Sequence, residues 1–156
     1  MASLLKQIQN DYKDALKKAN KVVVSVLRLL ISAIHNKEIE KRARGEEVGE
    51  DEILGIIQKQ IKARKESIDA YRRGRRKDLV EKEQKEIAVL QRYLPKQLAK
   101  EELEKIVQET IQETEAESLK DMGRVMKEVM GKVKGRAEGK VVSEIVKQML
   151  GARYNF

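Results

Sequence analysis

The segment from residue 132 to residue 140, KVKGRAEGK, combines the residue types that bind phosphate groups. Its glycines, Gly135 and Gly139, allow backbone N–H groups to approach an anion closely, and a helix predicted to start near residue 140 adds the positive end of its dipole. Four cationic side chains supply charge: Lys132, Lys134, Arg136 and Lys140. We predict that these four residues contact phosphate. The alternative is that the glycines only shape a turn, with Gly131 ending the preceding helix.

The densest cationic cluster is RRGRRK at residues 72–77. The planar guanidinium group suits phosphate oxygens, so four arginines are candidates for nucleic-acid binding: Arg72, Arg73, Arg75 and Arg76. Arginines at the end of a helix also complement its dipole and bond its last carbonyls, which is a purely structural role. Both interpretations stay open. The chain has only four tyrosines, one phenylalanine and no tryptophan, so stacking of single-stranded bases is not expected.

Side chains that carry catalysis or bind metals are not grouped at useful spacing. His35 is the only histidine, and the chain has no cysteine. Acidic pairs such as Glu46/Glu47 lie where helices are expected to begin, and there they complement the helix dipole. The glycine-rich segment also lacks the spacing of a nucleotide-binding P-loop, because Val141 follows Gly139 and Lys140. We therefore predict no catalytic residues, no cofactor and no metal site.

The location of the protein is predicted from three features. The lack of cysteine excludes disulfides, and the opening residues, MASLLKQIQNDYK, lack the basic-then-apolar order of a signal peptide. The longest apolar run, residues 22–34, is too short to span a membrane. These features predict a cytosolic protein without a membrane-spanning segment.

The elements that would hold the cationic residues are expected to be helices. Charged residues make up 38% of the chain and aromatic residues 3%, with one proline, which favours an all-α protein. The spacing of apolar residues predicts seven helices, near residues 3–18, 22–44, 50–73, 78–94, 100–113, 118–131 and 140–150. The β-branched residues Val22 to Val24 would also suit a strand, but the helical pattern continues to Gly45.

The predicted helices fall into two groups. Pro95 stops the fourth helix, and the sign of the local charge changes after it. We predict a four-helix N-terminal bundle at residues 1–95 and a small three-helix C-terminal domain at residues 96–156. Because the first half of the second helix is apolar almost all round, we expect it to be the central helix of the bundle.

The net charge of +8 is unevenly distributed. Counting Lys and Arg against Asp and Glu gives +7 for residues 1–95, −4 for residues 96–117 and +5 for residues 118–156. Basic surfaces attract phosphate polymers and anionic lipid. No strongly amphipathic helix with Trp or Phe on its apolar face is predicted, which makes lipid the weaker choice and nucleic acid the stronger.

Three stretches of the chain together resemble the YqeY family, whose domain also forms the tail of the GatB subunit of glutamine-dependent aminoacyl-tRNA amidotransferases. They are VLRLLISAIHNKEIEKR, ARKESIDAYRRGRRKDLVEKEQKEIAVLQRYLPKQL and KDMGRVMKEVMGKVKGRAEGKVVSEIVKQML. The resemblance implies the same division into four and three helices, and an association with tRNA. The chain shows no counterpart of the catalytic portion of the amidotransferase.

Three functional hypotheses follow from the sequence. The first is a tRNA-associated binding module of or beside the amidotransferase system, without its own catalytic site. The second is a protein-interaction or accessory subunit that does not bind RNA, for which Met122, Met126 and Met130 could form an adaptable groove; at helical spacing, they more often form core. The third, a carbon–nitrogen ligase with glutamine as amido-N donor, is implied by the resemblance alone. The oligomeric state is not predicted.

Overall fold

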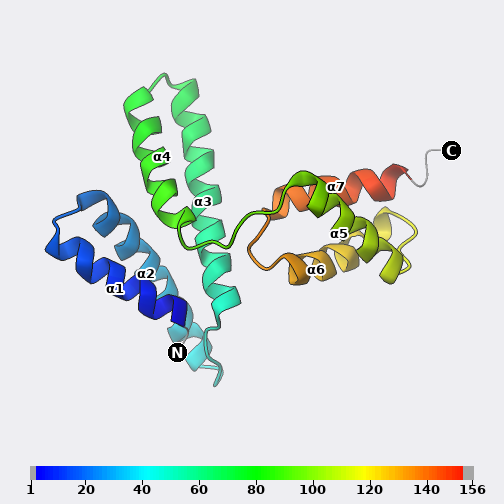
Figure 1. Ribbon diagram of the computed structural model, residues 1–156, viewed down its shortest axis with the longest axis horizontal. Coiled ribbons are helices and arrows are strands. Elements are labelled where there is room, and N and C mark those ends of the chain that lie inside the picture. The colour runs from blue at the N-terminus through cyan, green and yellow to red at the C-terminus, as the bar shows by residue number, and fades with distance from the viewer. Residues whose placement is uncertain (1–2, 153–156) are drawn as a thin grey trace. The chain divides into compact units, whose positions relative to one another are not determined.

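The computed structural model describes residues 3–152, which form seven α-helices and one short 3-10 helix, with no strand in this range (Figure 1). The all-α class predicted from the sequence is confirmed. Residues up to Leu94 form one compact unit, and Pro95 begins a second.

The first unit contains four helices: α1 (Ser3–Lys17), α2 (Lys21–Arg42), α3 (Glu50–Arg73) and α4 (Lys77–Gln91). They form two helical hairpins, α1 with α2 and α3 with α4, and α2 packs against both helices of the second hairpin (Figure 1). Asn20 caps α2 by accepting a hydrogen bond from the backbone N–H of Val23, so the β-branched opening of this segment is helical.

The core of the first unit is aliphatic, and α2 supplies Val26, Leu27, Leu30 and Ile34 to it. The outer face of α2 is not covered within this unit. Leu29 is 55% exposed and Val22 38% exposed. As predicted for a central helix, α2 contacts each of the other three helices, α1, α3 and α4, although part of its apolar surface stays exposed.

A cluster of charges is enclosed between α3 and α4. The guanidinium of Arg64 lies 3.1 Å from a carboxylate oxygen of Glu83 and also contacts the carboxylate of Glu86. All three side chains are at most 15% exposed. One cation thus neutralises two nearly buried carboxylates, and the sequence pattern did not single out any of the three residues.

Replacing Arg64 should unfold the first unit more easily. Arg64→Ala leaves two enclosed carboxylates without a cation, and we expect a loss of roughly 3 kcal/mol in the free energy of unfolding. Urea denaturation followed by circular dichroism measures this loss. Lys62→Ala, on the exposed side of the same helix, is the control and should change stability by less than about 0.5 kcal/mol. Equal effects of the two variants would contradict the role given to Arg64.

The second unit contains α5 (Lys100–Glu113), the 3-10 helix η1 (Leu119–Asp121), α6 (Met122–Val133) and α7 (Gly139–Ala152). Its core combines one apolar face from each α-helix, including Val107, Val129 and Val146. Met122, Met126 and Met130 are partly buried against this core. Their position agrees with the core interpretation of the methionine stripe rather than with an open groove.

The helix ends of the second unit differ partly from the sequence prediction. Ser118 and Asp121 form a capping box, but it precedes η1, whereas the sequence predicted that the α-helix itself begins near residue 118. The Asp121 carboxylate accepts hydrogen bonds from the N–H groups of Glu117 and Ser118, which lowers its pKa. Gly131 does not end α6, because the helix continues to the fully buried Val133. The last helix was predicted to end near residue 150, but Gly151 lies inside α7, which continues through Ala152.

Candidate phosphate-binding site

The turn between α6 and α7 is built from consecutive left-handed residues. Lys134 has φ 36° and Gly135 has φ 83°, and the N–H of Arg136 then donates to the carbonyl of Val133 at 2.8 Å. Gly135 is buried, and its positive φ explains why a glycine stands there. The chain reverses within five residues, and α7 begins at Gly139.

The segment before α5 pairs with this turn. The N–H of Leu98 donates to the carbonyl of Arg136 at 2.8 Å, and the side-chain amide of Gln97 donates to the carbonyl of Gly135 at 3.0 Å. These bonds bring the start of α5 beside the turn that leads into α7, as Figure 1 shows. Lys96 precedes the paired residues and is exposed. Lys96 therefore belongs with the cationic residues at this end of the unit. The sequence did not predict it as a site residue.

Three of the four cations predicted in the 132–140 segment are available to a ligand. Lys134, Arg136 and Lys140 are exposed, and none of them makes an ion pair within residues 3–152. We call these three residues together with Lys96 the turn site. The segment contains one carboxylate, Glu138, next to the start of α7.

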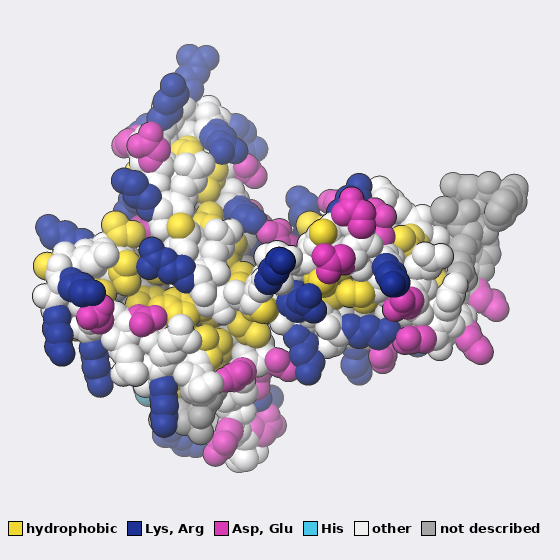
Figure 2. Space-filling view, viewed as in Figure 1, with side chains coloured by type: hydrophobic (Ala, Val, Ile, Leu, Met, Phe, Trp, Pro, Cys, Tyr) yellow, Lys and Arg dark blue, Asp and Glu magenta, His cyan; other side chains and the backbone are white. Residues whose placement is uncertain are grey.

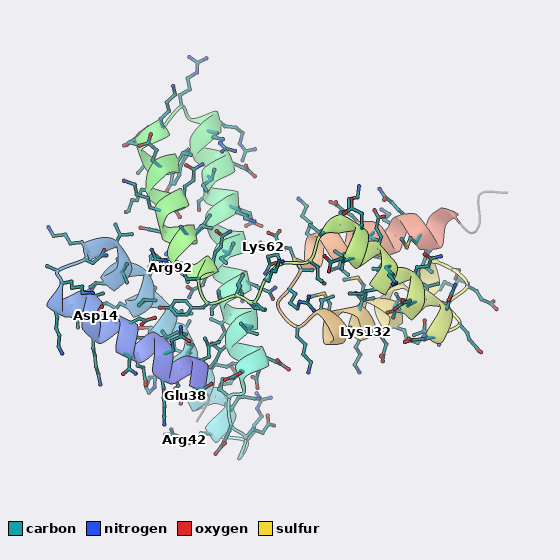
Figure 3. All side chains as sticks on the ribbon, in the orientation of Figure 1. Asp14, Glu38, Arg42, Lys62, Arg92 and Lys132 are labelled. Carbon is teal, nitrogen blue, oxygen red and sulfur yellow. The ribbon has the colours of Figure 1, made fainter. Side chains whose placement is uncertain are left out.

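Lys132 is placed differently from the other three. Its amine donates to the hydroxyl of Thr110 at 2.8 Å and to the carboxylate of Glu113 at 2.7 Å, so it ties α6 to α5. Figure 3 shows its side chain on α6, away from the turn. Because its amine already has two partners, Lys132 would have to give up these bonds to reach a phosphate.

The start of α7 adds a fixed positive end to the turn site. The first turn of α7 contains no acidic residue, although Glu138 directly precedes it, and the free N–H groups of this turn carry a partial positive charge. The start of α5 lies nearby, but Glu101 and Glu102 in its first turn complement that dipole. The arrangement suits an anion at α7, held by side-chain cations and backbone N–H groups.

The RRGRRK cluster lies at the end of the α3–α4 hairpin in the first unit, so the predicted site residues belong to two different units. Arg76 forms a two-point ion pair with Asp78, with N–O distances of 3.2 and 3.1 Å. This hydrogen-bonded pair raises the pKa of Arg76 and lowers the pKa of Asp78. Arg72, Arg73 and Arg75 are exposed.

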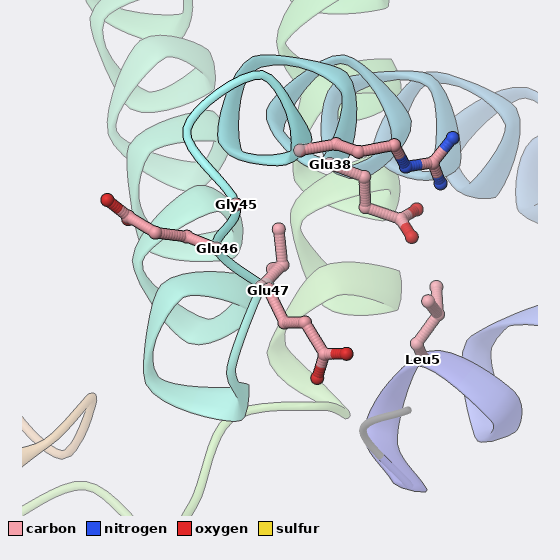
Figure 4. A pocket seen from close by; sticks show the side chains of 7 residues that line it. Leu5, Glu38, Gly45, Glu46 and Glu47 are labelled. Atoms are coloured by element: carbon pink, nitrogen blue, oxygen red, sulfur yellow. The ribbon is translucent and has the colours of Figure 1, made fainter.

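A hollow in the first unit does not resemble a phosphate site. It has a volume of about 390 Å³, lies beside the α2–α3 loop and is lined by Leu5, Glu38, Arg42, Gly45, Glu46, Glu47 and Val48 (Figure 4). Its three carboxylates would repel an anion, although the Glu46 side chain extends away from the other two.

Within residues 3–152, no group of three or more His, Cys, Asp or Glu residues could hold a metal ion. No helix in the same range is long and apolar enough to cross a membrane.

Removing the Lys132 amine should weaken the second unit. Lys132→Ala deletes the bonds to Thr110 and Glu113, and we expect a loss of roughly 1 kcal/mol in the free energy of unfolding. Thermal unfolding measures the change. Lys140→Ala removes an exposed cation without an ion pair and should have an effect below about 0.5 kcal/mol. A Lys132 variant as stable as the Lys140 variant would show that the α5–α6 bonds add nothing.

The fold and the turn site define a basic, all-helical protein of two compact units whose candidate site is suited to binding an anion. The family model described as "Yqey-like protein" matches residues 5–150, nearly the whole chain. The chain belongs to the YqeY family, as the resemblance of the three sequence stretches indicated.

Curated relatives come from fungi. The chain is 38% identical over 91 residues to "Altered inheritance of mitochondria protein 41, mitochondrial" of Pyrenophora tritici-repentis, which covers 58% of this chain and 48% of that protein. It is 34% identical over 87 residues to the protein of the same name from Lachancea thermotolerans, covering 56% and 46%. An uncharacterized protein of Schizosaccharomyces pombe, C22F3.15, is 32% identical over 88 residues, covering 56% and 69%. The matched region thus spans about half the length of the first two relatives.

The names of these relatives contradict the predicted cytosolic location. Two of the three are called mitochondrial proteins, which points to mitochondria rather than the cytosol. The prediction failed because it rested on the absence of cysteine and of a secretory signal. Those features argue against an oxidising, secretory environment, but they do not distinguish between compartments that keep thiols reduced.

Proposed function

We propose that this YqeY-family protein is a tRNA-associated binding module of or beside the amidotransferase system, acting without a catalytic site of its own. The observation that carries the proposal is the grouping of exposed cations in the turn site. Lys134, Arg136 and Lys140 are exposed around the start of α7, whose first turn has no acidic residue, and Lys96 is brought beside the turn by the bonds of Gln97 and Leu98. The choice of tRNA as the phosphate polymer is supported by the family resemblance, which implies an association with tRNA.

The contacts are proposed to be with the phosphate backbone rather than with bases. Stacking on bases needs exposed aromatic rings. Tyr12 and Tyr71 are half-buried against the core of the first unit, and Tyr93 is 9% exposed, with its hydroxyl donating to Asp11 at 2.6 Å. The remaining aromatic residues, Tyr154 and Phe156, lie outside the described residues. Binding through phosphates predicts affinity for folded tRNA with little dependence on its sequence.

Removing the turn-site cations should lower the affinity for tRNA and should make binding less sensitive to salt. For the Lys134→Ala, Arg136→Ala, Lys140→Ala triple variant, we expect at least a tenfold loss of affinity for bulk tRNA, about 1.4 kcal/mol. The slope of log affinity against log salt should fall by up to about 2–3, since each phosphate contact contributes nearly one unit. Fluorescence anisotropy over a salt series measures both quantities.

The matched control removes three cations from the middle of the same helices. Lys105, Lys127 and Lys147 are exposed and lie on α5, α6 and α7. Their triple alanine variant has the same net charge as the turn-site variant and should bind tRNA within about threefold of the wild type. If both triples lose the same affinity, binding follows net charge and the turn site is not the contact. No binding of the wild type at low salt would refute tRNA association altogether.

The second hypothesis, an accessory subunit that binds protein, is favoured by a separate observation. Large apolar side chains are exposed on the α1–α2 hairpin, including Leu29 and Ile39 at 55% and 53%. Exposed apolar surface is a common feature of protein contacts. Affinity purification after nuclease treatment separates the two proposals, because a protein partner bound directly would survive removal of RNA. The ligase activity is still implied by the resemblance alone.

A further inference from the structure

The turn between α3 and α4 forms an exposed basic tip. Figure 2 shows Lys and Arg side chains projecting from the end of this hairpin. Arg72 and Arg73 lie in the last turn of α3, and all residues from 72 to 77 are exposed. We call Arg72, Arg73 and Arg75 the hairpin-tip arginines. None of them makes an ion pair within residues 3–152, whereas Arg76 is bound to Asp78.

The sequence also allowed a structural role for these arginines, in which their side chains bond the last carbonyls of α3. Backbone N–H groups fill this role instead. The N–H of Gly74 donates to the carbonyl of Ala70, that of Arg75 to Arg72, and that of Arg76 to Tyr71, at 3.1, 3.1 and 2.9 Å. These bonds satisfy carbonyls of the last turn without any side chain. The guanidinium groups are therefore not needed to cap α3. The only structural reason left for arginines at this position is their interaction with the helix dipole.

The conformation of Arg75 is not itself a sign of function. Its φ of 56° is left-handed, but Ala19 after α1 and Glu115 after α5 adopt φ 53° in the same way. The three turns are therefore similar helix ends. What distinguishes the α3–α4 turn is the group of arginines around it.

We propose that the hairpin-tip arginines form a second phosphate-binding surface, which contacts the backbone of the RNA that the turn site binds. This inference rests on the proposed function for the identity of the ligand. Exposed guanidinium forks form two parallel hydrogen bonds with phosphate oxygens, which lysine cannot reproduce.

An RNA partner fits the tip better than a membrane surface. An amphipathic segment that lies in a membrane surface inserts apolar side chains into the lipid beside its cations. The large apolar neighbours of the tip, Tyr71 and Leu79, are half-buried and not available. By contrast, the α1–α2 turn carries exposed Leu16 and Val22 near its lysines. The composition of the tip is that of a surface that binds phosphates in water.

The test compares two hairpin turns of the first unit in the full-length chain. The tip variant is Arg72→Gln, Arg73→Gln, Arg75→Gln. The control is Lys17→Gln, Lys18→Gln, Lys21→Gln, which removes the same three charges at the α1–α2 turn. With bulk tRNA we expect the tip variant to bind about tenfold more weakly, with a salt slope lower by about 2–3, and the control within about threefold of wild type. A charge-preserving variant, Arg72→Lys, Arg73→Lys, Arg75→Lys, should keep most of the slope but lose part of the affinity.

The outcomes separate this inference from the proposed function. If the tip variant binds as the wild type does, or no worse than the control, the second surface is refuted and the turn site is unaffected. If the tip variant loses affinity while the turn-site triple does not, the turn site is refuted and the tip stands as the phosphate surface. If the tip variant loses binding to phosphatidylserine vesicles but not to tRNA, the tip binds lipid and the inference is wrong.

Discussion

Two hydrogen bonds hold the segment before α5 against the α6–α7 turn, from Leu98 to Arg136 and from Gln97 to Gly135. Each bond adds only about 1 kcal/mol, so the packed core of the three helices must supply most of the stability of this arrangement. The two bonds nevertheless decide its geometry. They place Lys96 beside the turn and fix the backbone that carries Lys134, Arg136 and the start of α7. The candidate site therefore depends on a contact between segments 38 residues apart.

The two units share a principle of construction. Each buries one apolar face of its helices in an aliphatic core and leaves the charged faces in water. The turns α3–α4 and α6–α7 each carry a group of exposed cations, and backbone hydrogen bonds satisfy carbonyls of the helix ends there. Two other cations have structural tasks: Arg64 lies between α3 and α4, and Lys132 joins α6 to α5. Rigid helices thus present the proposed binding side chains at or beside short turns.

Helical periodicity was sufficient to predict most of the elements. The predicted ranges 50–73 and 100–113 coincide with α3 and α5, because acidic first turns and regular apolar spacing mark both helices. The end of α6 was not predictable from Gly131, since burial of Val133 outweighs the small cost of glycine inside a helix. The candidate site was predicted in part. Its turn follows from Gly135, but the approach of Lys96 and the engagement of Lys132 depend on tertiary packing.

The most direct test of tRNA binding at the turn site is an NMR titration of the ¹⁵N-labelled chain with bulk tRNA, at a salt concentration that keeps exchange fast. The account predicts the largest shifts for the amides of Gly135, Arg136, Gly139 and Lys140, with a smaller group at Arg72 to Arg75. Shifts confined to the exposed apolar face of α2, or no shifts at all under low salt, would contradict it.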